Sequence, residues 1–344
     1  MDTNQHSMAF SHLSRNLNRI MSVTYSLLSK QDATTSSAII SHFKESSSFL
    51  KLSSSEGSAI LQRDEEDGTK LQAGIDLAKS KGVIDPNFVP EPYLDIDVLG
   101  KTPEEVAAQI IETIEKDENG TSAKKGKVIV LCGLSGTGKG TTVSKLREFL
   151  SNGDTNRQVV SWSNGNIFRS VTLLAVAWAK QNQSEAETLD VTKALTKENV
   201  ASFMSMLSFQ KVNGVWDTKI EGLGFDTTIS SIQNTILKGP DVSKNIPTVA
   251  QDTQGEVILF ASEAIEQMVS ADDEEIVVLL EGRQQTVDYV RTPFRFVLTL
   301  SDSSLIGKRR AAQRVMAAAL EKAQEGDSED KIGSILEEEL EKMI

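Results

Sequence analysis

The sequence predicts an α/β protein built on a doubly wound parallel sheet of about five strands. Apolar runs of strand length alternate with segments of helical periodicity between residues 93 and 324. Strands that are separated by helices pair in parallel, and the helices then cover both faces of the sheet. A glycine-rich loop also joins the apolar run Val128–Cys132 to a helical pattern that carries Val143 and Leu146. A strand, a glycine-rich turn and a helix in this order are typical of such sheets.

The glycine-rich loop, Gly133–Thr142, has the spacing G-x-x-x-x-G-K of a phosphate-binding loop. Its glycines let backbone N–H groups converge on phosphate oxygens, and the following helix adds the positive end of its dipole. Lys139 supplies a point charge for the β- and γ-phosphates. The loop therefore predicts a nucleoside triphosphate site. The residues expected to contact the nucleotide are Gly133, Ser135, Gly136, Gly138, Lys139, Gly140, Thr141 and Thr142.

Composition excludes several classes of protein. The 344 residues are 39% hydrophobic and 25% charged, as expected for a soluble globular chain. The formal net charge of −13 argues against a nucleic-acid-binding surface, because phosphate backbones select basic faces. No apolar run reaches the roughly 18 residues that a membrane span needs. We therefore expect small-molecule partners, and the sequence identifies no protein partner.

Cysteine and histidine are too sparse for several kinds of catalytic site. Cys132 is the single cysteine, so an internal disulfide and a multi-cysteine metal site are excluded, and a reducing compartment such as the cytoplasm is expected. All three histidines precede residue 43. Any chemistry in the rest of the chain must then use Lys, Arg, Asp, Glu and backbone groups, which suits phosphoryl transfer.

Residues 1–58 are polar and rich in serine, without a sustained period. We interpret them as an extension that is disordered or weakly helical. No acidic residue stands between Asp2 and Asp32, and a few basic and apolar residues in this stretch weakly resemble an organelle transit segment. Targeting to an organelle is therefore the alternative to a cytoplasmic location.

Helix signals are clearest after a short strand at 93–98. Thr102 can cap the next helix, Pro103 suits its first turn, and Glu105 completes a capping box. This predicts a helix over 103–116 with Val106, Ile110 and Ile114 on one face. The remaining elements of the core are then expected as strand 127–132, helix 139–151, strand 158–162, helix 165–180, strand 276–280, strand 294–300 and helix 303–324.

The stretch 181–271 interrupts this alternation and is interpreted as a substrate-binding insertion of helices and a hairpin. Asn213-Gly214 stands between two runs of alternating apolar residues. This dipeptide favours a type I′ turn, because both of its residues tolerate a positive φ.

Two further motifs follow strands of the predicted sheet. Ser163–Arg169 follows the second strand and contains Gly165, while Glu281–Arg283 follows the third. The carboxyl ends of parallel strands meet at one edge, where open α/β sheets bind ligands. We therefore expect Arg169 and Arg283 to contact an anionic ligand near the phosphate-binding loop.

The order of these motifs resembles the cytidylate kinases, a family of P-loop nucleoside monophosphate kinases. The G-K-G-T at Lys139 is similar to theirs, and the family carries DTGxxYR after its second strand, a hairpin-containing insertion, and DGRD after its third. The resemblance implies that Arg169 and Arg283 hold the phosphate of the acceptor with Gly165 beside it. It also implies that Glu281 lies near Mg²⁺, with Thr141 as a second candidate for the metal.

Some positions depart from the family's pattern. Ser163 and Gln284 replace aspartates of the two strand-end motifs, and no basic residue stands between Lys244 and Arg283 to read cytosine. The phosphate-binding positions match the family better than the base-reading ones.

The resemblance also implies a circular permutation. The family's lid motif, RDxxDxxR, follows its arginine-rich helix, whereas here Arg63–Lys70 fits that motif near the front of the chain, with lysine in the last position. Arg63 would then act catalytically, and Asp67 and Lys70 would contact the substrate. Residues 59–344 would form the kinase domain. Its parts would be a lid-like segment at 59–92, a strand and helix at 93–116, the phosphate-loop core at 127–180, the insertion at 181–271 and the second half of the core at 272–344.

The function implied is phosphoryl transfer from ATP with Mg²⁺ to a nucleoside monophosphate, CMP or dCMP first. The acceptor phosphate is already an anionic nucleophile, so the reaction needs positioning and charge neutralisation rather than a general base. Lys139, Arg63 and Arg283 are the catalytic residues under this interpretation. Two alternatives remain open: a kinase for another small metabolite, and a catalytically silent ATP-binding module.

Overall fold

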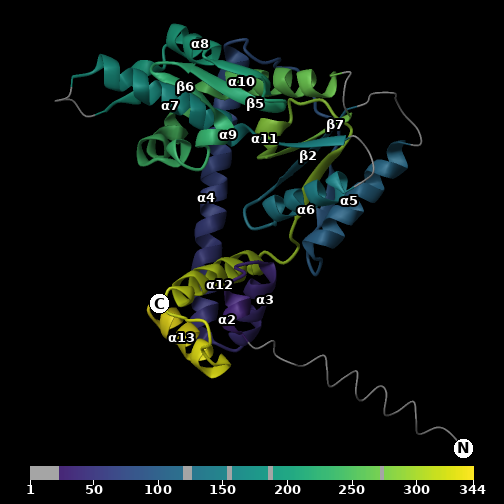
Figure 1. Cartoon of the computed structure of the whole chain (residues 1–344), viewed down its shortest axis with the longest axis vertical. Coiled ribbons are helices and arrows are strands. Elements are labelled where there is room, and N and C mark those ends of the chain that lie inside the picture. The colour runs from purple at the N-terminus through teal and green to yellow at the C-terminus, as the bar shows by residue number, and fades with distance from the viewer. Residues whose placement is uncertain (1–22, 119–125, 153–156, 185–188, 272–274) are drawn as a thin grey trace, which may run out of the picture. The chain divides into compact units, whose positions relative to one another are not determined.

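The chain folds into two compact units (Figure 1). The computed structural model describes residues 23–118, 126–152, 157–184, 189–271 and 275–344. Met1–Arg63 and Asp302–Ile344 form the helical unit, and Asp64–Ser301 forms the α/β unit. Residues 1–22, and most of the segment between the predicted helix 103–116 and the predicted strand 127–132, lie outside the described residues.

A five-stranded parallel sheet forms the centre of the α/β unit, as predicted. Its order is β1-β8-β2-β7-β3, and every neighbouring pair is parallel. The strands are β1 (Leu94–Asp97), β2 (Lys127–Gly133), β3 (Arg157–Ser163), β7 (Glu275–Gly282) and β8 (Arg295–Thr299). Each expected strand is present to within two residues at either end.

Helices cover both faces of this sheet, because its strands are apolar on both sides. On β2, Ile129 and Leu131 belong to a core shared with helices α5 and α6, whereas Val128 and Val130 belong to a core on the other face with α7 and α10 (Figure 1). The bounds of these helices are α5 Pro103–Glu118, α6 Lys139–Ser151, α7 Asn164–Asn182 and α10 Pro240–Val269.

Strand β1 and helix α5 occupy one edge of the sheet, which confirms the interpretation of residues 93–116. β1 pairs with β8, and Ile110 is fully buried in the core between α5 and the sheet. The capping box is also present. The Thr102 amide donates to the Glu105 carboxylate at 2.8 Å, and the Glu105 amide donates to the Thr102 hydroxyl at 3.2 Å. Local signals and tertiary packing therefore agree for this helix.

The guanidinium of Arg295 is fully buried at the start of β8. It donates to the Tyr93 hydroxyl at 2.8 Å, to the Asp288 carbonyl at 2.7 Å and to the Val290 carbonyl. Tyr93 in turn donates to the Asp288 carboxylate at 2.7 Å, and burial raises the pKa of both groups. The segment before β1 is thereby tied to β8 and to the loop that precedes it.

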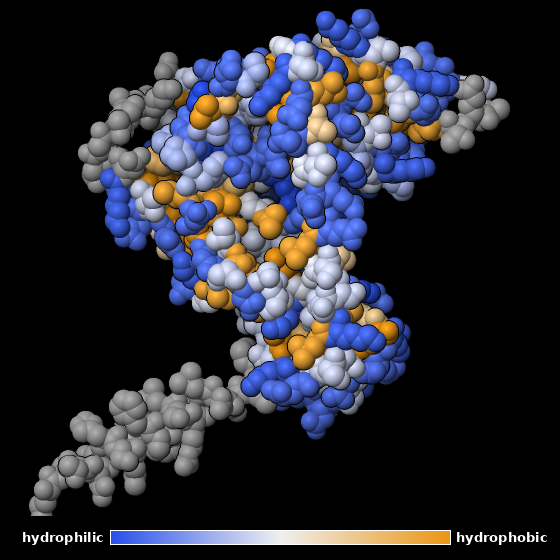
Figure 2. All heavy atoms as spheres, turned by 180° about the vertical axis from the view of Figure 1, so that it is seen from behind, coloured by the Kyte–Doolittle hydropathy of each residue, from blue (hydrophilic) through white to orange (hydrophobic). Residues whose placement is uncertain are grey.

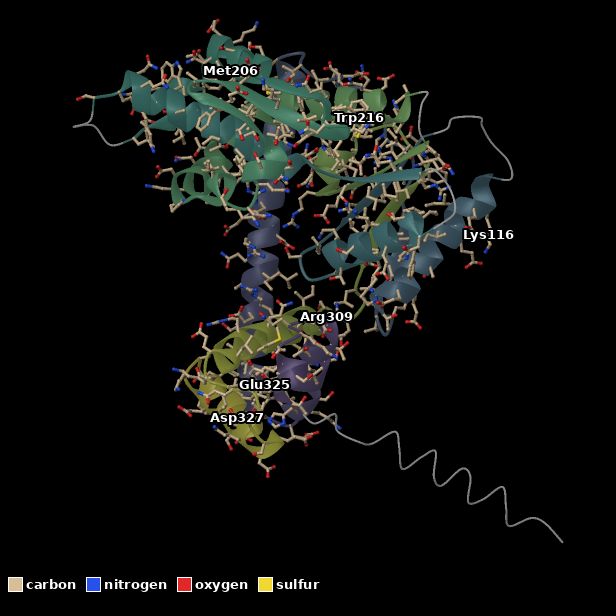
Figure 3. The ribbon with its side chains drawn as sticks, in the orientation of Figure 1. Lys116, Met206, Trp216, Arg309, Glu325 and Asp327 are labelled. Atoms are coloured by element: carbon tan, nitrogen blue, oxygen red, sulfur yellow. The ribbon has the colours of Figure 1, made fainter. Side chains whose placement is uncertain are left out.

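A separate antiparallel sheet carries the predicted hairpin. Its strands are β4 (Leu207–Val212), β5 (Val215–Gly222) and β6 (Phe225–Thr228). Asn213 and Gly214 have φ values of 52° and 82°, which confirms the type I′ turn. Trp216, which Figure 3 labels, lies on β5. Its ring stacks on that of Phe209 at 5.2 Å between ring centroids. Shorter elements flank these sheets: η1 (Val191–Ala194), α8 (Lys197–Ser205), α9 (Ile229–Ile232), η2 (Ile236–Lys238) and α11 (Gln284–Val287).

The helical unit corrects the interpretation of residues 1–58. In its described part, α2 (Tyr25–Leu28), α3 (Ala33–His42) and the first part of α4 (Ser47–Ser80) are regular helices. Their apolar residues, including Ile39 and Phe49, share one core with residues of α12 (Ser304–Leu320) and α13 (Glu329–Glu341). The sequence predicts a disordered or weakly helical extension, because the residues that cover its few apolar side chains stand far away in the sequence.

Two predicted boundaries also differ from the structure. The boundary at 58/59 falls inside α4, so residues 59–80 continue a helix and do not begin a separate lid-like segment. Residues 304–341 pack in the helical unit and do not complete the α/β core.

None of the helices in the described part of the chain is long and apolar enough to cross a membrane. On the face seen in Figure 2, hydrophilic residues predominate and apolar residues are exposed in several groups.

Replacing Ile110 by Ala tests whether α5 belongs to the core. The change removes apolar contacts between α5 and the sheet and leaves a cavity, so we expect a loss of about 2–5 kcal/mol in the free energy of unfolding. Urea unfolding followed by tryptophan fluorescence measures it. Glu112→Ala on the exposed face of the same helix is the control. Equal stabilities of the two variants would contradict the described packing.

Candidate functional site

The phosphate-binding loop has the backbone conformation that its glycines permit. Gly133, Gly136 and Gly138 have φ values of 144°, 81° and 85°, which other residues rarely adopt. A side chain at Gly133 would also place its Cβ 2.5 Å from the Leu298 carbonyl oxygen. The Thr137 hydroxyl donates to the Leu134 carbonyl at 2.8 Å and closes the turn from within. The loop then leads directly into α6.

Lys139 begins α6 and folds back over the loop. Its ammonium donates to the carbonyls of Gly133 and Leu134 at 2.7 and 2.8 Å. Burial lowers the pKa of Lys139, and the positive charge of Arg283 lowers it further. The ammonium therefore lies at the base of the loop, close to a second cation.

The register of the sheet brings the predicted strand-end motifs to the same edge. Cys132 at the end of β2 pairs with Gly282 on β7, and Glu281 pairs with Ser163 at the end of β3. The Glu281 carboxylate lies 4.0 Å from the position that a Cβ would take at Gly140, so it faces the start of α6. The three motifs therefore meet, as the parallel sheet predicted.

The residues predicted for the metal provide a small donor set. The Glu281 carboxylate makes no hydrogen bond or ion pair within the part of the chain that the structure describes. Thr141 is exposed on the first turn of α6, whereas Thr142 is buried. No group of three His, Cys, Asp or Glu residues that could hold a metal ion occurs among the described residues. One carboxylate and one hydroxyl suit a cation that keeps several waters and also binds nucleotide phosphates, as Mg²⁺ does.

The Asp64 carboxylate binds to Ser135 of the phosphate-binding loop, a contact that the sequence did not predict. One of its carboxylate oxygens accepts from the Ser135 amide at 2.7 Å. The other accepts from the Ser135 hydroxyl at 2.7 Å and from Arg283 Nη2 at 2.6 Å. The Asp64 side chain is only 2% exposed. Asp64 follows Arg63 in the lid-like motif. The sequence indicates this motif but predicts its contacts from Arg63, Asp67 and Lys70 and not from Asp64.

Burial disfavours the charged form of Asp64, but the hydrogen bonds from Arg283 and Ser135 outweigh this effect. Together they lower the pKa of Asp64 to about 2. The carboxylate is therefore ionised throughout the physiological range and partly neutralises the Arg283 guanidinium.

The other predicted residues of the lid-like motif are more exposed than Asp64. The carboxylate of Asp67 is half-exposed and lies 3.9 Å from Arg283 Nη2. Arg63 and Lys70 are exposed on α4. The catalytic role of Arg63 and the substrate contact of Lys70 stay predictions.

Arg169 differs from Arg283 in having no counter-charge. It lies half-buried on the second turn of α7, and in the described part of the chain its guanidinium makes no hydrogen bond or ion pair. A Cβ at Gly165 would lie 3.0 Å from Arg169 Nη1 and 3.4 Å from the Ser163 hydroxyl. Glycine at this position therefore leaves room for the guanidinium beside the end of β3. The predicted anion contact of Gly165 and Arg169 stays a prediction.

The basic residues of the 303–324 helix have a structural explanation in the helical unit. Arg310 and Arg314 both form ion pairs with Glu56 on α4, the first at 3.8 Å. Arg309 lies on the same helix, α12 (Figure 3). These pairs connect the two ends of the chain.

No protein-family model, curated protein or solved structure matches this chain. Its function must therefore be inferred from the residues of the site themselves.

The pH dependence of stability tests the Asp64 contacts. Asp64 has a lower pKa in the folded chain than in the unfolded chain, where a carboxyl of this type has a pKa near 3.8. Its contribution of about 2 kcal/mol is therefore present above pH 4 and is lost as the pH falls toward 2. We expect the stability difference between wild type and Asp64→Asn to shrink over this window in urea unfolding. A difference that is constant from pH 7 to pH 2.5 would contradict the described hydrogen bonds.

Proposed function

We propose that Gly133–Thr142 binds ATP and that the chain transfers its terminal phosphoryl group to a nucleoside monophosphate, CMP or dCMP first. The single observation that carries the proposal is the loop conformation. Three glycines at positive φ, a half-buried lysine and the start of α6 stand at the carboxyl edge of a parallel sheet. This arrangement supports binding of a polyphosphate, because backbone N–H groups, a helix dipole and an ammonium are gathered at one point.

A second observation favours a transferase over a simple binding module. Two arginines from different strand ends, Arg169 and Arg283, accompany the loop, and Arg169 lacks a partner in the described part of the chain. A half-buried cation with no counter-charge is a suitable contact for a second anion, which is the phosphate of the acceptor in this proposal. A module that only binds ATP has no need for this second anion site.

The proposed chemistry requires no general base. An oxygen of the acceptor phosphate forms a bond to the γ-phosphorus while the bond from that phosphorus to the β–γ bridging oxygen breaks, and ADP leaves. Lys139 and Arg283 neutralise charge on the transferring group, and Arg169 orients the acceptor. Thr141 and Glu281 would hold Mg²⁺, directly or through water, and the ion would neutralise the β- and γ-phosphates.

The arrangement of the sheet also supports the proposed circular permutation of a P-loop kinase fold. β1 and α5 precede the loop in sequence, yet they occupy the edge next to β8. This is the place that the last strand and helix of a nucleoside monophosphate kinase would take under the resemblance. A five-stranded parallel sheet is common to many α/β proteins, so the motifs and not the sheet distinguish this proposal.

The catalytically silent alternative has one observation in its favour. Gln284 replaces an aspartate of the resembled motif and begins α11 directly after Arg283. If turnover is absent, ATP should still bind at the loop while no monophosphate yields ADP.

Lys139→Ala tests the assignment of the loop. Removing the ammonium deprives the β- and γ-phosphates of their main cation, so we expect weaker ATP binding and a loss of turnover by orders of magnitude. Calorimetry with ATP and Mg²⁺, followed by an ADP-release assay over CMP, dCMP, UMP, AMP and GMP, measures both. Lys145→Ala is the matched control, because Lys145 lies on the same helix but pairs with Glu104. Unchanged ATP affinity of the Lys139 variant would overturn the proposal.

Arg169→Ala tests the acceptor site. Loss of a charge-assisted contact of about 1.5–3 kcal/mol should raise KM for the acceptor roughly tenfold or more and change KM for ATP much less. Lys180→Ala is the control, because Lys180 is an exposed residue near the other end of α7 that pairs with Asp241. Equal increases in both KM values would place Arg169 in the ATP site.

A further inference from the structure

The Asp64 carboxylate occupies a place that is built to receive an oxyanion. The Ser135 amide, the Ser135 hydroxyl and Arg283 Nη2 all donate to it within 2.7 Å. Ser135 belongs to the phosphate-binding loop, and Arg283 follows the neighbouring strand β7. Three donors from two separate elements of the sheet therefore converge on one anion, and that anion belongs to the protein itself.

A carboxylate and a phosphate make the same demands on such a place. Both present at least two oxygens with negative charge, and both are bound by backbone N–H groups, hydroxyls and guanidinium ions. The donors cannot serve both anions at once, because the carboxylate already lies at hydrogen-bonding distance from each and is almost fully buried. A phosphate that reaches the Ser135 amide must displace Asp64.

The Glu281 carboxylate is a second anion at this edge, and its charge acts on Lys139. Among the described residues neither Arg169 nor Glu281 takes part in an ion pair. Lys139, which should meet phosphates when they are present, instead donates to two loop carbonyls. Within the part of the chain that the structure describes, direct hydrogen bonds to the Asp64 carboxylate come from Ser135 and Arg283, although its charge also acts on Lys139.

We propose that Ser135 and Arg283 form a single phosphate subsite and that Asp64 is an internal competitor for it. Identification of the natural ligand as ATP rests on the function proposed above, but the competition itself concerns any polyphosphate. The apparent affinity is the intrinsic affinity reduced by the fraction of chains in which Asp64 has left the subsite. Asp64 thereby sets how much polyphosphate is needed to fill the loop.

Competition and structural support predict opposite results when Asp64 is replaced. If Asp64 only holds the loop in shape, its removal lowers stability and weakens polyphosphate binding together. If Asp64 competes, its removal lowers the stability of the free chain but strengthens binding, because the donors no longer have to release a carboxylate.

The test uses inorganic tripolyphosphate as the probe, since it needs neither a base pocket nor an acceptor. Calorimetric titrations at pH 7.5 compare the full-length wild type with Asp64→Asn and Asp64→Ala. The alanine variant is included because asparagine can still accept from Ser135, and urea unfolding establishes that each variant is folded. Glu65→Gln is the matched control, since it removes one negative charge from the next, exposed position of α4 without touching Ser135.

We expect tripolyphosphate to bind roughly tenfold or more tightly to both Asp64 variants than to wild type, in line with the loss of a charge-assisted competitor. We expect Glu65→Gln to change the affinity less than threefold. Tripolyphosphate binding that is unchanged or weaker in both Asp64 variants would overturn the competition and leave the proposed function standing. If neither wild type nor either variant binds tripolyphosphate or ATP, the loop is not a polyphosphate site, and both proposals fail.

Discussion

Complete burial of the Arg295 guanidinium is the constraint on which the arrangement of the α/β unit depends. A buried cation must find a partner for nearly every N–H, since each unsatisfied donor in an apolar surrounding costs free energy. Glu91, Tyr93 and the carbonyls around Asp288 supply these partners. They come from the segment before β1 and from the end of α11, so one side chain fixes the edge strand and the loop that follows β7.

This constraint reaches the candidate site through the chain itself. The segment from Arg283 to Val290 begins at the phosphate-binding loop and ends at carbonyls that Arg295 holds. Arg283, the first residue of this segment, is thereby attached to backbone that Arg295 holds in place. A residue that binds a ligand in a defined geometry needs such support. Asp64 on α4 accepts a hydrogen bond from Arg283. The site therefore joins α4, the phosphate-binding loop and the end of β7, which are distant in sequence.

Much of the fold could be predicted because its signals are local. The capping box at Thr102, the period of α5, the Asn213-Gly214 turn and the apolar run of β2 each depend on a few neighbouring residues. The helical core around Ile39 and Phe49 could not be predicted, because its other half lies near residue 315 and serines mask the pattern. The meeting of Gly133, Ser163 and Glu281 at one edge could be predicted, because strands that alternate with helices pair in parallel. Asp64 was missed because its role depends on where a helix lies in space and not on its neighbours in sequence.

The order of strands in the sheet bears on how the chain can acquire its structure during synthesis. Neighbouring strands of the parallel sheet are far apart in sequence: paired residues of β3 and β7 stand 118 positions apart, and Arg295 and Tyr93 stand 202 positions apart. A chain leaving the ribosome has therefore made β1, β2 and β3 well before any of them has a neighbour to pair with. Sheets assembled from such distant segments form slowly, and their unpaired apolar strands are prone to associate with other chains. The glycine-rich loop between β2 and α6 lacks its contact with the Leu298 carbonyl until β8 has emerged.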